Sequence, residues 1–185
     1  MKRFILSVAL LEILLWGCAR WVIVGGKYVA TSENYEVDLP NGWRKQNLNR
    51  DFLRVTKDGI NLQEIAVGRW PVDKDPPHTK RKFATGMLPQ EVAELVIDDF
   101  RSNTGLMGYE VTENSPSNVG GYRGFKVMYR YQTKSGLKKR GAYYGVLLDK
   151  WLYYLYYEAP ERYYFANDYE VFERIKESFR IAKGG

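Results

Sequence analysis

Short segments in which apolar and polar residues alternate recur along the chain, and this period of two is typical of strands that pack on one face. Residues 35–39 alternate apolar and acidic side chains, and Pro40-Asn41-Gly42 after them predicts a turn. Residues 21–24 and 27–30 lie on either side of Gly25-Gly26 and predict two short strands around a glycine turn. The pattern therefore predicts that the folded part begins with β-structure.

A hairpin, a loop and a helix are predicted next. Residues 52–56 and 60–70 flank Asp58-Gly59, a pair that supplies the positive φ of a tight hairpin. Residues 71–86 carry several prolines and charges, which exclude a strand and predict a loop. From Pro89, a residue that suits the first turn of a helix, apolar residues recur at helical spacing until Gly105.

The strand pattern returns from Tyr109, with turns predicted at residues 118–121, 135–136 and 149–150, which gives a meander of about four strands. Residues 151–157 are apolar or aromatic on both faces, which indicates a central strand covered on each side. Asn167 with Glu170 has the pattern of a capping box and predicts the start of a closing helix. The expected buried stripe of that helix is Tyr169, Phe172, Ile175 and Phe179.

Together these elements predict an α+β fold in which an antiparallel sheet of about seven strands is covered by two helices. The chain has 185 residues, 45% of them hydrophobic and 27% charged, and after loss of a short leader it has the size of one domain. Aromatic residues make up 15% of the chain, so a large core is expected. The one cysteine excludes an internal disulfide framework.

The first residues have the pattern of an export signal. Lys2 and Arg3 precede an apolar stretch, residues 4–16, that is shorter than the roughly 20 residues of a spanning helix. The stretch ends in Leu15-Trp16-Gly17-Cys18, which resembles the lipobox of bacterial lipoproteins. We therefore expect a signal peptide over residues 1–17 and a single domain over residues 18–185, attached to the membrane through a lipid on Cys18. A plain cleaved signal and an uncleaved anchor running through residues 21–24 are the alternatives.

The resemblance to lipoproteins also implies an address, the bacterial cell envelope. Ala19 follows the cysteine, where an aspartate commonly marks retention at the inner membrane, so the resemblance favours the outer membrane, facing the periplasm, in a Gram-negative organism. Export excludes nucleic acid as a normal partner, although the net charge is +6. The expected partners are therefore the membrane itself, another envelope protein or an anionic lipid surface.

Several structural motifs resemble one known family. They are Val-Asp-Leu-Pro-x-Gly-Trp at residues 37–43, Gly-Gly-Tyr-Arg-Gly-Phe at residues 120–125 and Ser-Phe-Arg at residues 178–180. With residues 88–103 and 159–179, they resemble uncharacterised bacterial lipoproteins with a PsbP-like domain, over nearly all of the exported chain. The resemblance implies an α/β/α sandwich that binds protein partners and assists assemblies. It implies no particular functional residue, and a likeness of fold only shifts the expectation about function.

The residues that could carry chemistry do not form a catalytic, metal or cofactor pattern. His78 is the only histidine, and no cysteine or second histidine completes a dyad or a metal shell around it. The acidic residues of the predicted helix are expected on its wet side; they are Glu91, Glu94, Asp98 and Asp99. Gly120-Gly121 lies between two predicted strands and is expected in a hairpin rather than in a phosphate loop. No cofactor and no metal are therefore expected.

Basic residues and tyrosines supply the candidate partner surface. Adjacent tyrosine pairs within strands place one ring on each face of the sheet, so one ring packs under a helix and the other faces elsewhere. The candidate surface consists of Lys80, Arg81, Lys82, Lys134, Lys138, Lys139, Arg140, Tyr144 and Tyr154. Solvated basic residues and core tyrosines explain much of this pattern without a partner.

Three functions remain open. The first is a non-enzymatic envelope lipoprotein that acts as a protein-binding or assembly module. The second is a carrier of a small apolar or glycan ligand in a tyrosine-lined cleft. The third is a hydrolase that uses His78 or the acidic helix.

Overall fold

Nine strands and two helices make up the part of the chain that the computed structural model describes, residues 21–47 and 52–182. In chain order they are β1 (Trp21–Ala30), β2 (Tyr35–Gln46), β3 (Phe52–Thr56), β4 (Glu64–Pro71), α2 (Pro89–Ser102), β5 (Met107–Val119), β6 (Tyr122–Gln132), β7 (Lys138–Leu148), β8 (Trp151–Pro160), α3 (Tyr164–Ser178) and β9 (Arg180–Ile181). The proposed lipidation site Cys18 and the signal segment lie outside the described residues.

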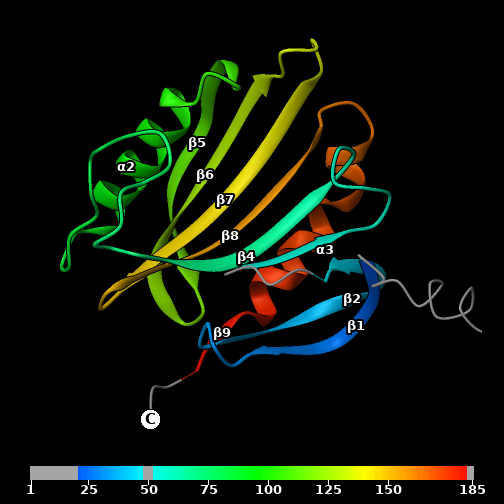
Figure 1. Ribbon diagram of the computed structural model, residues 1–185, viewed down its shortest axis with the longest axis horizontal. Helices are drawn as coiled ribbons and strands as arrows, with labels where there is room; N and C mark the ends of the chain where they lie inside the picture. Colours follow the sequence, from blue (N-terminus) through cyan, green and yellow to red (C-terminus); the bar gives the residue numbers. More distant parts are fainter. Residues whose placement is uncertain (1–20, 48–51, 183–185) are drawn as a thin grey trace, which may run out of the picture.

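The strands form one antiparallel sheet in the order β1-β2-β3-β4-β8-β7-β6-β5, with the short β9 paired to β2. Helix α2 packs on β5, β6 and β7, and α3 packs on β2, β7 and β8. The sheet curves so that α3 lies between β1–β2 and the central strands, whereas α2 covers the other face beside β5 (Figure 1). The predicted α+β class with two helices is confirmed, and the described residues hold nine strands where about seven were expected.

The central strand β8 shows why the sheet is covered on both faces. It pairs with β4 on one side and β7 on the other. Its alternate residues Tyr153, Leu155 and Tyr157 enter the core beneath α3. Leu152, Tyr154 and Tyr156 belong to the core beneath α2. Because successive side chains of a strand point to opposite faces, an aromatic run of this length needs a helix on each side, as the sequence predicts.

The N-terminal strands are longer than the sequence predicts. Residues 21–30 form one strand rather than two, because pairing with β2 continues on both sides of an irregularity in which Gly25 lies opposite residues 40–42. Residues 40–42 do not turn the chain, and β2 runs through them to Gln46. Here the pairing of two long strands overrides local turn chemistry. By contrast, every predicted turn of the four-strand meander is confirmed.

Helix α3 begins earlier than the predicted capping box. Its N-cap is Tyr163, without a side-chain cap, and Asn167 lies inside the first turn. Burial explains the shift: the ring of Phe165 packs 5.2 Å from that of Tyr157, and Tyr157 Oη donates a hydrogen bond to the carbonyl of Tyr164 at 2.9 Å. Contacts with β8 therefore add a turn that the local sequence does not signal.

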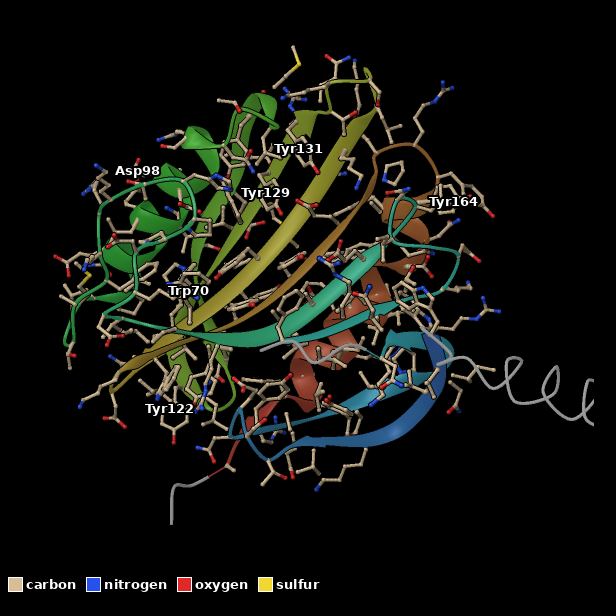
Figure 2. The ribbon with its side chains drawn as sticks, viewed as in Figure 1. Trp70, Asp98, Tyr122, Tyr129, Tyr131 and Tyr164 are labelled. Atoms are coloured by element: carbon tan, nitrogen blue, oxygen red, sulfur yellow. The ribbon has the colours of Figure 1, made fainter. Side chains whose placement is uncertain are left out.

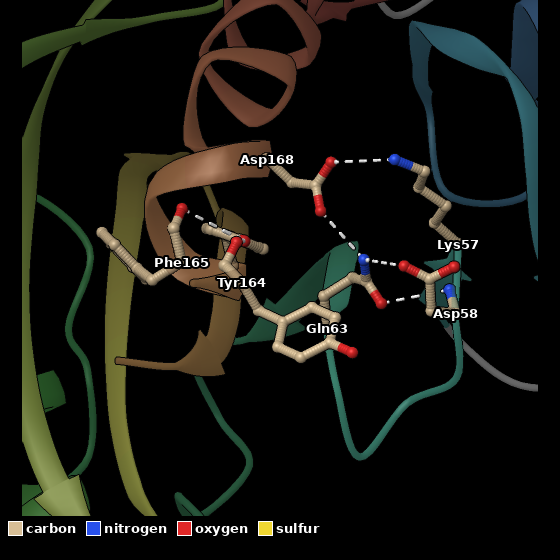
Figure 3. A network of polar contacts seen from close by, with 7 residues as sticks. Lys57, Asp58, Gln63, Tyr164, Phe165 and Asp168 are labelled. Atoms are coloured by element: carbon tan, nitrogen blue, oxygen red, sulfur yellow. Dashed lines mark hydrogen bonds and ion pairs between the residues drawn. The ribbon is translucent and has the colours of Figure 1, made fainter. Parts of the chain in front are cut away.

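A buried glutamine joins the β3–β4 connection to α3. Gln63 Nε2 donates to Asp168 Oδ2 at 2.9 Å and to Asp58 Oδ2 at 3.0 Å, and Gln63 Oε1 accepts from the N–H of Asp58 at 3.1 Å (Figure 3). Lys57 Nζ lies 3.6 Å from Asp168 Oδ1 and balances the buried carboxylate. The predicted hairpin is confirmed, but its connection spans residues 57–63 because these contacts hold a longer loop.

Candidate functional site

A cavity of about 300 Å³ opens between α2, the loop of residues 72–88 and the face of the sheet that α2 covers. We call it the α2 cleft. Its floor comes from the sheet and includes Trp70, Tyr129, Tyr143, Tyr154, Tyr156 and Glu158. Its other walls come from α2 and the loop and include Pro76, His78, Phe83, Val96, Asp99 and Phe100. Figure 2 shows Trp70 and Tyr129 beside α2, and Asp98 on the outer side of that helix.

Glycines in the strands allow aromatic rings to lie flat on the sheet and form the floor of the α2 cleft. A Cβ atom on Gly68 would lie 2.8 Å from Tyr154 Oη and 3.1 Å from Tyr154 Cζ. The rings of Tyr129 and Phe125 likewise reach over Gly141 and Gly145, their partners on β7. The tip of each ring therefore lies over the neighbouring strand, in the space that a Cβ atom on the glycine would occupy. The absence of a Cβ is what lets the rings lie along the sheet instead of standing on it.

The rings also contact one another in a continuous row. Phe125 and Tyr143 have centroids 6.0 Å apart with planes 12° from parallel, and Tyr143 and Tyr154 are 5.9 Å apart at 17°. Tyr154 and Tyr156 continue the row at 6.4 Å and 13°, while Phe100 of α2 lies 5.7 Å from Tyr143 with an edge-on ring. Nearly parallel, offset rings attract one another, so the floor is a rigid aromatic surface.

One carboxylate ends the row. Glu158, the last cleft residue of β8, accepts hydrogen bonds from Tyr129 Oη at 2.8 Å and from Tyr131 Oη at 3.1 Å, one on each oxygen. Burial raises the pKa of Glu158, and the two hydroxyls oppose this effect by favouring the ionised form. Burial and the nearby Glu158 charge raise the pKa of Tyr129 well above its ordinary value, so its hydroxyl stays a donor.

A second carboxylate lies next to Glu158 on the neighbouring strand. Glu64 of β4 is the cross-strand partner of Glu158, and it accepts a hydrogen bond from Tyr156 Oη at 2.7 Å. Unlike Glu158, it has a cationic partner, because Arg54 Nε lies 2.6 Å from Glu64 Oε1. The two acids therefore differ in how their charge is compensated.

The acidic residues of α2 divide between its two sides. Glu91 and Glu94 are exposed as expected, and Glu91 caps the helix by accepting the N–H of Leu88 at 2.7 Å. Asp99 is 8% exposed, so its predicted place on the wet side is wrong. Its Oδ1 accepts the backbone N–H groups of His78 at 2.7 Å and Thr79 at 3.0 Å, which ties the loop to the helix. The structure thus brings His78 and Asp99 together through the backbone of His78 and not through its imidazole.

The basic part of the candidate surface is divided between two places. Lys80, Arg81 and Lys82 lie in the loop beside α2, where Arg81 pairs with Asp98 and Lys82 Nζ lies 3.2 Å from Asp75 Oδ1. Lys134 lies in the connection between β6 and β7, which projects from one end of the sheet (Figure 1). Lys138, Lys139 and Arg140 begin β7, and the guanidinium of Arg140 lies 4.6 Å from the ring centre of Phe165.

The two tyrosines of the candidate surface lie on opposite faces of the sheet. Tyr154 lines the α2 cleft. Tyr144 is 3% exposed beneath α3 and donates to Glu173 Oε1 at 2.7 Å, so it does not reach a surface. The prediction that adjacent tyrosines face opposite sides is confirmed by the pairs 143–144, 153–154 and 156–157.

Sequence reasoning assigned neither Phe100 nor Glu158 to a site, and it considered Asp99 only as part of the wet face of the helix. A signal existed for Glu158, because period-two alternation from Tyr154 places it on the same face as Tyr156 at the end of an aromatic strand. Phe100 belongs to the apolar residues at helical spacing, so its place on the inner side of the helix is predicted. The place of Asp99 gave no such signal, since it depends on how the loop folds over the helix.

Two further observations concern the described residues alone. They contain no group of three or more His, Cys, Asp and Glu side chains placed to hold a metal ion. They also contain no helix with the length and apolar character needed to cross a membrane.

Comparisons with known proteins agree on the fold. The family model described as PsbP matches residues 26–181. The solution structure of cyanobacterial PsbP (CyanoP) from Synechocystis sp. PCC 6803 has a TM-score of 0.60 at 13% identity, covering 90% of this chain and 95% of that one. The Ran-binding protein Mog1p of Saccharomyces cerevisiae has a TM-score of 0.57 at 10% identity, covering 88% of this chain and 97% of that one. No curated protein matches the chain by sequence.

Proposed function

Because the chain belongs to the PsbP family, we propose that it is a non-enzymatic binding domain, attached to an envelope membrane through a lipid on Cys18, that holds a small ligand in the α2 cleft. The proposal unites the expected tether with the carrier function that the sequence left open. A protein-binding role, which the sequence placed first, is a second candidate with its own surface.

The observation that carries this proposal is the composition of the cleft. A volume of about 300 Å³ is at the lower end of the range of small-molecule sites, which extends to roughly 1,000 Å³. Such sites combine apolar and aromatic walls with a few polar groups that orient the ligand. The α2 cleft matches this description, since Glu158 and the tyrosine hydroxyls are set into walls of phenylalanine, tyrosine, valine and proline.

A cleft-filling variant tests this site. We expect Asn103→Trp, which places an indole into the cleft at the end of α2, to weaken binding of a neutral solvatochromic dye such as Nile red at least about tenfold, because the ring occupies the ligand volume. Fluorescence titration of the full chain measures the effect. Gln90→Trp, at an exposed position of the same helix, is the matched control and should bind the dye as the parent does. Equal binding by the parent and Asn103→Trp would contradict the proposed site.

The distance between the proposed lipid and the fold supports a role close to the membrane. Only two residues separate Cys18 from Trp21, where β1 begins. At a maximum of about 3.6 Å per residue, Trp21 can lie no more than about 11 Å along the chain from the acylated residue. The domain would therefore stay at the membrane surface and meet ligands and partners there.

A protein-binding role has one observation of its own, the outer strand β1. Within the described residues, β1 pairs with β2 alone, so its other edge is an unpaired sheet edge. Exposed apolar residues follow this strand, with Ile23 70% exposed, Val29 57% and Val22 39%. An apolar edge strand can add a strand from another protein. The fold also occurs in Mog1p, which is a Ran-binding protein.

One experiment in intact cells tests both the tether and this edge. A photo-crosslinking amino acid at Ile23 should give a protein adduct in intact cells, whereas the same group at Leu137, 42% exposed in the distant β6–β7 connection, should not. Mass spectrometry of the same purified product should find a mature N-terminus at an acylated Cys18. An adduct with lipid alone would contradict the protein-binding role, and an N-terminus at Met1 would contradict the tether.

The exposed basic residues support an anionic neighbour for the tethered domain. Each lysine or arginine near a negative lipid surface contributes about 1 kcal/mol, screened over a Debye length. Arg81 and Lys82 have carboxylate partners already, so the residues available for this role are the exposed Lys80 and those of the second cluster, Lys134, Lys138 and Lys139. An anionic lipid surface is accordingly part of the proposal.

A further inference from the structure

The charges that line the α2 cleft are opposite in sign to the charge of the whole chain. The chain carries a net charge of +6. Among the described residues that line the cleft there is no lysine and no arginine, whereas Asp99 and Glu158 both contribute carboxylates. His78 is the one basic side chain of the lining. An anionic ligand would therefore meet two carboxylates in a poorly hydrated space, and a cationic ligand would be attracted to them.

Glu158 in particular lacks a compensating charge. Its oxygens accept hydrogen bonds from the neutral hydroxyls of Tyr129 and Tyr131, and within the described part of the chain it takes part in no ion pair. Lys139 acts on it only at a distance. A partly buried carboxylate without a cation is costly, unless a cation arrives with the ligand. The neighbouring Glu64, held by Arg54, shows how the same sheet compensates a carboxylate that is not in the cleft.

The aromatic surface around Glu158 suits the same class of ligand. An ammonium group within about 6 Å of an aromatic ring centre is attracted by the ring quadrupole. One ring of the lining already holds such a group, because Lys74 Nζ lies 4.5 Å from the ring centre of Trp70. Tyr143, Tyr154 and Tyr156 provide further rings, and Gly68 lets the ring of Tyr154 lie close to the sheet beneath the cavity.

We propose that the α2 cleft binds an organic cation, an ammonium group on a small apolar body, with the tyrosine rings around the cation and the carboxylate of Glu158 as its counter-charge. This inference rests on the proposed function, namely that the cleft is a ligand site, and it adds the chemical class of the ligand. The size of the cavity limits the ligand to a small molecule or to the head of a larger one.

A pair of isosteric probes tests the charge directly. Choline and 3,3-dimethylbutan-1-ol have the same shape, and only choline carries a positive charge. By calorimetric titration of the full chain in a non-ionic detergent, we expect choline to bind at least about tenfold more tightly than the alcohol, as the cation–π and carboxylate attractions require. Glu158→Gln should reduce choline binding to the level of the alcohol. Glu170→Gln, an exposed carboxamide on α3, is the matched control and should leave binding unchanged.

Each other outcome has a distinct meaning. Equal binding of choline and the alcohol would overturn the inference and leave the cleft as a site for neutral ligands. Glucose binding in place of choline would overturn it in favour of a glycan. Full choline binding by Glu158→Gln would overturn the assigned counter-charge.

If Nile red binds but neither isostere does, the ligand class is wrong and the proposed function stands. Where choline binds, tighter binding of phosphocholine would indicate a lipid headgroup, and weaker binding a free cation, as the source of the same chemistry.

Discussion

Gly141→Ala is expected to destabilise the folded chain by about 3 kcal/mol, because a methyl group on this strand residue would overlap the ring of Tyr129. Tyr129 is 1% exposed and its hydroxyl is bound to Glu158, so the ring cannot move aside without breaking that hydrogen bond. Urea unfolding followed by far-ultraviolet circular dichroism measures the change. The midpoint should fall while the slope of the transition stays the same.

A double-mutant cycle shows whether the ring is the cause. In a Tyr129→Val background the space above Gly141 is open, and adding Gly141→Ala should cost less than about 1 kcal/mol. If the alanine costs as much with valine at position 129 as with tyrosine, the loss comes from the strand itself, and the ring of Tyr129 is not what requires a glycine at position 141.

Phe172→Ala is expected to cost about 3–5 kcal/mol, the range for removing a buried phenylalanine. Phe172 is fully buried on α3, and its ring lies 5.8 Å from that of Tyr144 and 5.6 Å from that of Tyr157. The substitution leaves a cavity between the helix and the two central strands. Differential scanning calorimetry of the full chain should show a lower melting temperature and a lower unfolding enthalpy.

The control for this variant lies two residues further along the same helix. Arg174 is exposed, so Arg174→Ala should change the free energy of unfolding by no more than about 0.5 kcal/mol. A similar loss in both variants would contradict this account, because Arg174→Ala removes no buried ring and alanine has the highest helix propensity.

The sequence predicts those elements whose pattern agrees with their tertiary environment. Helix α2, the meander from β5 to β8 and the central place of β8 follow from helical spacing, from turn residues and from an apolar run on two faces. The same alternation predicts correctly that each adjacent tyrosine pair divides between the two cores.

The errors occur where distant contacts override a local signal. Pro40-Asn41-Gly42 has the composition of a turn, yet these residues form an irregularity within β2, because β1 pairs with β2 on both sides of them. Tyr163, rather than Asn167, precedes α3 because Phe165 is buried against β8. Neither outcome can be read from a window of neighbouring residues, since both depend on a partner strand elsewhere in the chain.

The cleft could be predicted only in part for the same reason. Tyrosines on one face of β7 and β8 predict an aromatic surface, and the sequence left a tyrosine-lined cleft open as one of three functions. The cavity itself depends on the loop of residues 72–88, which Asp99 fastens to α2 through the amides of His78 and Thr79. A carboxylate that looks like part of a wet helix face turns out to position a wall of the site.

The α2 cleft is built partly from sheet strands and partly from the loop of residues 72–88, and this division separates ligand selectivity from folding. The floor belongs to strands whose glycines and rings are also the core, so substitutions there change stability and ligand contacts together. The loop contributes Pro76, His78 and Phe83 without pairing to any strand of the described chain. Exchanging that loop while keeping Asp99 offers a way to re-target the protein to other ligands on an unchanged sheet.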